Sequence, residues 1–171
     1  MLNISAVSVT PLKSSDVLTD FKCENVECSD FLRNPQGALE FQRKNLGVTY
    51  VFRSAGTVIG FITVTMSAFR KHSTGQADED EQAIDVPCLL LPYMARDIRY
   101  KAQGAGKIMS EWTISLASQL SNSIGCRFVI IEIKQEMITL FQQYGFELLP
   151  PDSNNRHYVM FFDLGMKASE Q

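Results

Sequence analysis

The sequence is poor in the residues that usually build metal sites. It contains only two histidines and four cysteines. His72 and His157 have no cysteine or carboxylate partner at a metal-ligand spacing, and the cysteines lack the close pairs of a zinc site. We therefore expect no metal, and we expect reduced, half-buried thiols among apolar neighbours. These cysteines are Cys23, Cys28, Cys88 and Cys126.

An excess of positive charge and a long apolar run are also missing. The formal net charge is −3 and the pI about 5.4, so nucleic acid is a disfavoured partner. No apolar run approaches the roughly 20 residues that span a bilayer, and the start does not resemble a signal peptide. With 45% hydrophobic residues in a chain of 171, the sequence predicts one globular domain, 1–171, in the cytoplasm and without membrane contact.

In the first half, residue periodicity predicts a strand, two helices and a β-hairpin. Helical spacing begins at Glu27, and Pro35 divides it into two helices, the second of which ends at Gly47. β-Branched and aromatic residues on both sides of the turn Arg53 to Gly56 predict the hairpin. The predicted strands are Ile4–Leu12, Val48–Phe52 and Thr57–Phe69.

A polar segment, Arg70 to Val86, follows the hairpin. It includes a run of acidic residues from Asp78 to Glu81, which cannot be buried without partners. We expect a solvated loop there. Its negative potential would favour the approach of a cationic acceptor.

In the second half, strands alternate with helices. Cys88 to Ala95 predicts a strand buried on both faces, in which Pro92 marks a bulge or an edge. A helix follows up to Gly125, and Arg127 to Ile133 is β-branched, so the three elements predict a parallel crossover. The helix carries an apolar stripe of Ile108, Trp112, Leu116 and Leu120. A short helix, 136–143, and two strands, 146–149 and 157–164, are predicted beyond it.

A glycine loop, Lys101 to Gly106, connects the Cys88 strand to the long helix. Backbone N–H groups and the positive end of the helix dipole suit a phosphate there, and glycine lets the backbone approach it closely. A P-loop is excluded because Ile108 stands where it needs Ser or Thr, and a Rossmann motif because Met109 replaces its third glycine. Arg96, Asp97 and Arg99, before the loop, are interpreted as ordinary polar turn residues.

The residues around this loop resemble the acetyl-CoA motif of GNAT acetyltransferases. The resemblance runs from Pro87 through Ala95-Arg96-Asp97 to Gly106. It continues in 124–132 and in 140–146, and the latter is similar to the family's second acetyl-CoA segment. Residues 21–32, 47–51 and 58–63 are similar to the branch that includes tRNA-acetylating toxins and their non-toxin relatives.

This resemblance implies an α/β GNAT fold with a mixed sheet of six or seven strands and helices on both faces. The sheet would split between the Cys88 and Arg127 strands. The implied activity is acetyl-CoA-dependent N-acetyl transfer to a primary amine. Acetyl-CoA and an amine acceptor are therefore the expected partners, and a homodimer is left open.

The resemblance also assigns acetyl-CoA to the loop and to the end of the preceding strand. Backbone amides would hold the pyrophosphate, while the pantetheine would run beside the strand end. Lys101 departs from the family's usual Gln or Arg but still complements phosphate, and the small Ala102 keeps the entrance clear. The pyrophosphate residues would be Gln103, Gly104, Ala105, Gly106 and Lys107, and the pantetheine residues Met94, Ala95 and Arg96.

Phe141 is a second departure from the family. It stands where most members have a tyrosine that protonates the leaving thiolate of coenzyme A, and phenylalanine has no proton to donate. Tyr144 lies three residues on and is either a substitute acid or a core aromatic. Glu132 is a candidate general base acting through water, or simply a carboxylate at a strand end.

Two alternatives to a general N-acetyltransferase stay open. The absent tyrosine also fits a catalytically silent module that binds acetyl-CoA. The resemblance to the toxin branch suggests acetylation of aminoacyl-tRNA. The net negative charge of the chain argues against this acceptor. The sequence does not identify the acceptor, since acceptor grooves are built from variable loops.

Overall fold

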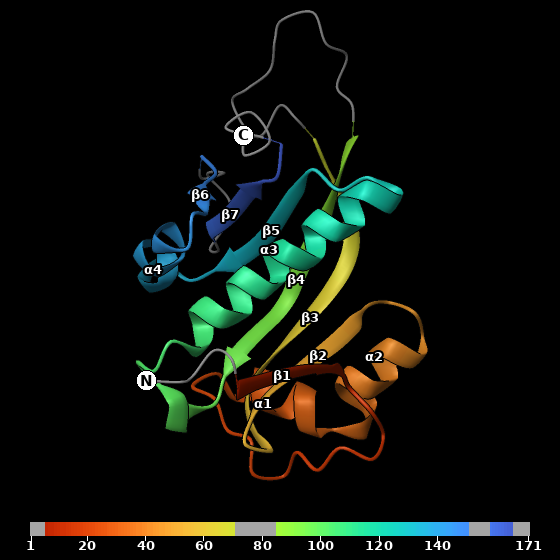
Figure 1. The fold of residues 1–171 in the computed structure, drawn as a ribbon, viewed down its shortest axis with the longest axis vertical. Coiled ribbons are helices and arrows are strands. Elements are labelled where there is room, and N and C mark those ends of the chain that lie inside the picture. The colour runs from red at the N-terminus through yellow and green to blue at the C-terminus, as the bar shows by residue number, and fades with distance from the viewer. Residues whose placement is uncertain (1–5, 71–84, 151–157, 166–171) are drawn as a thin grey trace, which may run out of the picture. The chain divides into compact units, whose positions relative to one another are not determined.

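The computed structural model describes residues 6–70, 85–150 and 158–165. Seven strands of this part of the chain form one mixed sheet in the order β1, β2, β3, β4, β5, β7, β6 (Figure 1). The predicted α/β architecture with a mixed sheet is confirmed. Both histidines and the acidic run 78–81 lie outside the described residues.

The strands agree with the predicted ones in number and order. They are β1 (Val7–Pro11), β2 (Val48–Ser54), β3 (Thr57–Arg70), β4 (Asp85–Arg96), β5 (Phe128–Ile133), β6 (Glu147–Leu148) and β7 (Tyr158–Asp163). The helices are α1 (Val26–Arg33), α2 (Glu40–Arg43), α3 (Ala105–Ile124) and α4 (Ile138–Gln143). A π-helix (Pro35–Leu39) and two 3-10 helices (Ile98–Tyr100 and Gln135–Met137) complete the described elements.

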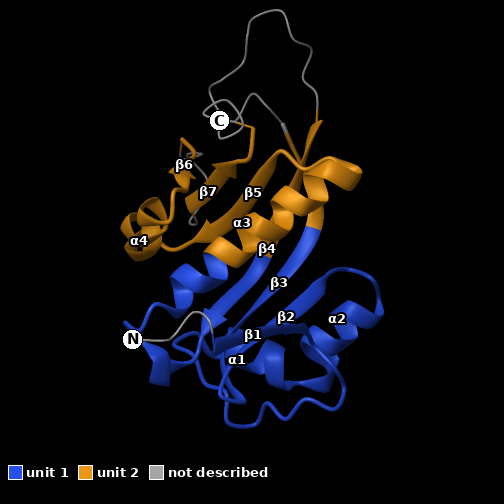
Figure 2. Ribbon diagram, in the orientation of Figure 1, with its two compact units in different colours: residues 1–65, 92–110 blue, residues 66–91, 111–171 orange. Residues whose placement is uncertain are grey.

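By its contacts the chain divides into two compact units (Figure 2). The first consists of Met1–Thr65 and Pro92–Ser110, and the second of Met66–Leu91 and Glu111–Gln171. Each unit therefore joins two separate segments of the sequence, and β3, β4 and α3 each contribute to both. That 1–171 forms a single domain stays a prediction.

The hairpin of the first unit is confirmed. β1 pairs antiparallel with β2, and β2 pairs antiparallel with β3. The register pairs Ser54 with Thr57, which leaves Ala55 and Gly56 as a two-residue turn. Their φ angles are 47° and 80°, as the mirror-image turns that suit the strand twist require.

Two helical segments separated at Pro35 precede the hairpin, as predicted. The Asn25 side chain accepts from the Glu27 N–H (2.9 Å) at the start of α1, which satisfies one of the unpaired donors of the first turn. The prediction that Gly47 ends the second helix is wrong. α2 ends at Arg43, and the left-handed residue behind it is Asn45 (φ 55°), since asparagine also tolerates this conformation.

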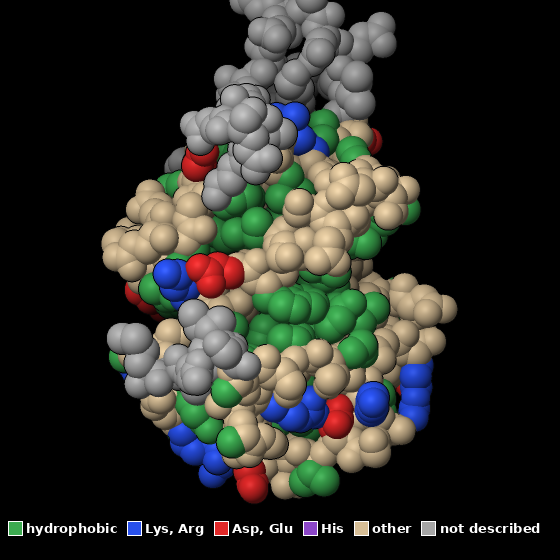
Figure 3. Space-filling model, in the orientation of Figure 1, with side chains coloured by type: hydrophobic (Ala, Val, Ile, Leu, Met, Phe, Trp, Pro, Cys, Tyr) green, Lys and Arg blue, Asp and Glu red, His purple; other side chains and the backbone are tan. Residues whose placement is uncertain are grey.

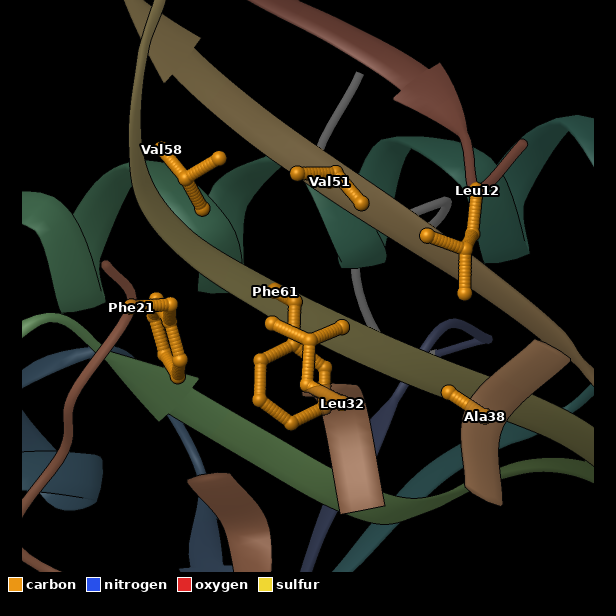
Figure 4. Close-up of a cluster of buried hydrophobic side chains, with 7 residues drawn as sticks. All are labelled: Leu12, Phe21, Leu32, Ala38, Val51, Val58 and Phe61. Atoms are coloured by element: carbon orange, nitrogen blue, oxygen red, sulfur yellow. The ribbon is translucent and has the colours of Figure 1, made fainter. Parts of the chain in front are cut away.

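Helices lie on both faces of the sheet in the first unit. One face carries a buried cluster to which α1 contributes Leu32 and β3 contributes Phe61 (Figure 4). On the other face a Cβ at Gly60 would lie 2.6 Å from the Met109 sulfur of α3. Neighbouring residues of a strand point to opposite faces, so α1 and α3 cover different sides. The cluster consists of Leu12, Phe21, Leu32, Ala38, Val51, Val58 and Phe61.

The predicted parallel crossover is present in the second unit. β4 pairs in parallel with β5 from Cys88 to Leu91, and Pro92, which has no N–H to donate, follows directly. β5 pairs antiparallel with β7, and β7 with β6. The core cluster of this unit is formed by Cys88, Phe128, Ile130, Leu149 and Phe161.

The apolar stripe predicted for α3 is shifted by one residue. The most deeply buried row is Ala105, Met109, Thr113 and Ala117, each no more than 1% exposed. Of the predicted stripe, Ile108 is buried, while Trp112, Leu116 and Leu120 are half-buried. Mostly small residues let the helix axis approach closely, and the larger ones cover the flanks. No helix of the described residues is long and apolar enough to cross a membrane.

Candidate functional site

The loop predicted to bind phosphate lies in the first unit, between β4 and α3. The Asp97 N–H donates to the Ile59 carbonyl (2.9 Å) and thereby continues the contact between β4 and β3. The Ile98 N–H donates to the Lys22 carbonyl (2.8 Å), which attaches the turn to the segment before α1. The loop therefore begins from a backbone that is held on two sides.

A buried carboxylate organises this turn. The Asp97 side chain is 0% exposed and accepts the Lys22 N–H (3.1 Å) and the Arg99 N–H (2.9 Å). The Arg99 guanidinium adds two donors, at 2.8 and 2.9 Å. Burial by itself raises the pKa of the Asp97 carboxyl, but these hydrogen bonds and the Arg99 charge outweigh it, so the pKa is lowered.

Asp97 is therefore more than the ordinary turn residue that we expected from the sequence. A buried charge is costly unless it is paired and hydrogen-bonded, and the structure supplies both kinds of partner. One sequence signal does point to it. Asp97 directly follows a buried strand and caps the 3-10 helix, where a carboxylate can accept backbone N–H groups.

Left-handed backbone shapes the loop itself. The φ angles of Ala102 and Gly104 are 57° and 90°. The Gly104 carbonyl accepts the Ile108 N–H (3.1 Å) as α3 begins, so the N–H groups of Ala105 and Gly106 belong to the first helical turn, which has no acceptor within the helix. Gly104 is exposed, and a Cβ there would meet nothing within 4 Å. An anion can therefore approach this helix start.

Two cations adjoin the loop and share one carboxylate. Glu24 Oε1 lies 2.9 Å from Lys101 Nζ and 3.4 Å from Arg96 Nη2. The hydrogen bond from Lys101 and the charge of Arg96 lower the pKa of Glu24. Sequence reasoning missed Glu24, because it lies 77 positions before Lys101 and nothing in its own neighbourhood marks it.

The residues predicted to flank pantetheine form the end of β4. Met94, Ala95 and Arg96 are all half-buried, and Ala95 packs against the cluster of the first unit. The Arg96 Nη1 atom is buried and finds no hydrogen-bond acceptor in the described part of the chain. A buried donor of this kind is costly to leave unpaired, so the strand end has an unused donor for a ligand.

The predicted catalytic residues all belong to the second unit. Phe141 of α4 is 4% exposed, and its ring packs edge to face against Tyr144 (centroids 5.8 Å apart) and Phe146 (5.5 Å). Tyr144 is half-buried and caps the end of α4. Glu132 is exposed on β5 between the buried Ile131 and Ile133. Their catalytic roles stay predictions.

Charged side chains are mixed in sign on the face drawn in Figure 3, where lysine and arginine lie beside aspartate and glutamate. On this face the described residues form no broad basic surface. Any phosphate contact here has to come from single cations and backbone N–H groups.

Several solved structures have a fold very similar to that of this chain. One, described as AtaT complexed with acetyl-methionyl-tRNAfMet, matches with a TM-score of 0.83 at 17% identity, covering 96% of this chain and 98% of that one. A Tyr-to-Phe mutant of KacT matches with a TM-score of 0.80 at 18% identity, covering 97% and 99%. A Tyr-to-Phe mutant of the AtaT toxin, bound to part of the antitoxin AtaR and to acetyl-CoA, matches with a TM-score of 0.75 at 20% identity, covering 94% of both chains.

These matches confirm the predicted GNAT fold over nearly the whole chain. No protein-family model and no curated protein matches the sequence. The expectation that nucleic acid is disfavoured finds no support, since one of these structures contains a tRNA and another is described as a KacTA-DNA complex.

Replacing Asp97 by asparagine is expected to destabilise the protein by about 1.5 to 3 kcal/mol at pH 7, because hydrogen bonds to a buried charge are lost. The folded-state pKa lies below the ordinary value of 3.8. The stabilisation from the Asp97 carboxylate is therefore complete when the pH is well above 3.8, and it disappears as the pH falls through the folded-state pKa. Denaturant unfolding at pH 7 and pH 3 measures both effects.

Asp30→Asn is the matched control. Like Asp97, Asp30 pairs with an arginine close behind it in the sequence, Arg33, at 2.8 Å. The Asp30 side chain, however, is 63% exposed. Such a surface pair contributes about 0 to 1 kcal/mol. Equal losses of stability in the two variants would show that the buried carboxylate does not brace the turn.

Proposed function

We propose that the chain is an acetyl-CoA-dependent N-acetyltransferase that moves an acetyl group to a primary amine. One observation carries the proposal. A left-handed loop at Ala102 and Gly104 opens the start of α3, directly behind a strand whose end is held by a buried carboxylate. This arrangement suits an anionic group such as a diphosphate.

The residues of the loop supply the donors that a diphosphate needs. The backbone N–H groups from Gln103 to Lys107 would bind its oxygens, and the dipole of α3 adds partial positive charge. Lys101 and the unused Arg96 Nη1 donor bring full charges to the same end of β4. Because most contacts come from backbone, the varied side chains of the loop do not weaken the site.

The comparisons support acetyl-CoA as the ligand and acetyl transfer as the activity. A neighbour in fold is described with acetyl-CoA bound although one of its tyrosines is phenylalanine. Another contains an acetylated aminoacyl-tRNA, which is the product of acetylating an amino group. At identities of 17% and 20%, these neighbours share only their fold with this chain. Acetyl-CoA binding is therefore inferred from the geometry of the loop.

In the proposed reaction the neutral amine attacks the thioester carbonyl carbon. The new C–N bond forms, the C–S bond breaks, and coenzyme A leaves as a thiolate that takes up one proton. The amine nitrogen loses one proton, for which the Glu132 carboxylate is our candidate acceptor through water. Phe141 cannot donate to the thiolate. We therefore assign most of the acceleration to holding the two reactants together.

Aminoacyl-tRNA is one specific acceptor that a comparison favours, because its α-amino group is a primary amine and a neighbour holds the acetylated form. We expect transfer of radiolabelled acetyl groups to charged tRNA to exceed transfer to a polyamine or peptide panel at equal amine concentration. Uncharged tRNA is the control. Equal labelling of all amines would leave N-acetyl transfer standing but would exclude aminoacyl-tRNA as the preferred acceptor.

Gly104→Glu is expected to abolish acetyl-CoA binding, because it places a carboxylate where the diphosphate lies. Calorimetry with coenzyme A as competitor should show an affinity loss of at least a hundredfold, about 2.7 kcal/mol. Gly56→Glu is the matched control, since Gly56 also has a positive φ (80°) and open space around its Cβ position. If both variants bind as the wild type does, the loop does not hold the diphosphate.

Phe141→Tyr is expected to raise kcat at least tenfold, and up to about 10² to 10⁴, if thiolate protonation limits turnover. The KM for acetyl-CoA should hardly change. Phe146→Tyr adds the same hydroxyl to the neighbouring buried ring (4% exposed) and should not accelerate transfer. Steady-state kinetics with the best acceptor measure all three proteins.

Tyr144→Phe separates the remaining assignments. A lower kcat in this variant would identify Tyr144 as the substitute acid. An unchanged kcat would show that Tyr144 does not protonate the thiolate, and Phe141→Tyr would then be the remaining test of this segment. If neither substitution alters a measurable activity, the assigned role of the segment 140–146 is wrong. Acetyl-CoA binding without transfer in every variant would favour the silent binding module.

A further inference from the structure

Two cysteines and a serine meet at the start of α1, in the first unit. The Cys23 thiol lies 3.1 Å from the Ser29 hydroxyl and donates to the Asn25 carbonyl (2.9 Å). The Cys23 N–H donates to the same serine oxygen (2.9 Å), and the Cys28 side chain lies close enough to the Cys23 thiol to lower its pKa. Both thiols pack against the core cluster of this unit and are half-buried, so a small reagent can reach them.

The other two cysteines have a different environment. Cys88 is 1% exposed and Cys126 is 6% exposed. Burial raises the pKa of Cys88 to about 11 and also raises that of Cys126. The hydrogen bond with Cys28, assisted by Ser29 and by the backbone of Asn25 and Ser29, outweighs burial and lowers the pKa of Cys23 to about 6. Nucleophilic thiolate is thus concentrated at Cys23.

We propose that Cys23 and Cys28 form a reversible oxidation site for small hydroperoxides, in which Cys23 is the attacking thiol and Cys28 the resolving one. The pair has the two features that such a site needs. The attacking sulfur is half-buried and hydrogen-bonded to Ser29 and Asn25, and a second half-buried thiol adjoins it against the same cluster. Cys88 and Cys126 also interact with each other, but both are buried, so a reagent does not reach them as it reaches Cys23.

The chemistry balances in two steps. The Cys23 thiolate attacks one oxygen of hydrogen peroxide, the O–O bond breaks, and the sulfur becomes a sulfenic acid while the other oxygen leaves and is protonated to water. The Cys28 sulfur then attacks the Cys23 sulfur, the S–O bond breaks, and a second water leaves. Two thiols are oxidised to one disulfide by one peroxide, and a dithiol reductant reverses the change.

The site adjoins the loop of the proposed function. Cys23 lies between two residues that contact this loop. The Lys22 N–H donates to the Asp97 carboxylate, and Glu24 forms an ion pair with Lys101. A disulfide would fix the backbone between these two contacts. On the basis of the proposed function, we expect the disulfide form to bind acetyl-CoA with an affinity at least threefold different from that of the dithiol form.

The test treats the full chain with equimolar to tenfold hydrogen peroxide and maps thiols by mass spectrometry of peptides. The expected product has lost two hydrogen atoms, carries a bridge between Cys23 and Cys28, and reverts with dithiothreitol. Cys28→Ser should accumulate the sulfenic acid at Cys23, which dimedone traps. Ser29→Ala, which removes the hydroxyl beside the thiol, should slow oxidation several-fold, and Cys23→Ser should leave Cys28 reduced. Circular dichroism verifies that each variant is folded.

Three outcomes are distinguishable. Oxidation at Cys88 or Cys126, or disulfides between molecules in place of the Cys23–Cys28 bridge, would overturn the proposal. A bridge that forms without changing acetyl-CoA affinity would establish the oxidation site and refute its coupling to the loop. Absence of acetyl-CoA binding in both redox forms would refute the proposed function, while the thiol map still decides on the oxidation site.

Discussion

Four hydrogen bonds hold the Asp97 carboxylate, three from the nearby Arg99 and one from Lys22, which lies 75 positions earlier in the chain. A carboxylate that is 0% exposed would be strongly destabilising without them, because its hydration is lost completely. The donors come from the segment before α1 and from the turn after β4. The cost of burial thus favours this geometry, since a turn that lost these donors would leave the charge unpaired. The left-handed loop and the start of α3 follow from this anchored point.

The ion pair next to the loop is exposed, in contrast to the buried Asp97 carboxylate. Glu24 and Lys101 are 60% and 69% exposed, so water screens their pairing and it contributes little to stability. Such a pair is easily exchanged. A diphosphate can compete for Lys101 at small cost, whereas Asp97 and Arg99 keep the backbone in place. Under the proposed function, a rigid backbone beneath an exchangeable surface charge would let the loop bind and release a charged ligand.

The aromatic packing in the second unit explains how phenylalanine fits at position 141. Its ring is enclosed by Tyr144 and Phe146, so the apolar ring stabilises the end of α4 through burial alone. A hydroxyl there would need a hydrogen-bond partner. The segment thus holds a buried ring without a proton donor at position 141, and under the proposed function the rate enhancement rests mainly on positioning the reactants.

Local rules were sufficient for much of this protein. The hairpin around residues 53–56, the division at Pro35, the parallel crossover and the glycine loop follow from periodicity, from the torsions open to glycine and from the missing N–H of proline. All of these act within a few residues. The end of α2 and the buried row of α3 were misjudged, because asparagine can replace glycine in a left-handed position and because the sheet decides how closely a helix approaches. Only the tertiary structure brings Lys22 to Asp97 and Lys101 to Glu24. Their contacts join residues 75 and 77 positions from one another, and a hydrogen bond or an ion pair over that separation depends on where the whole chain places its backbone, which no pattern in a short stretch of sequence encodes.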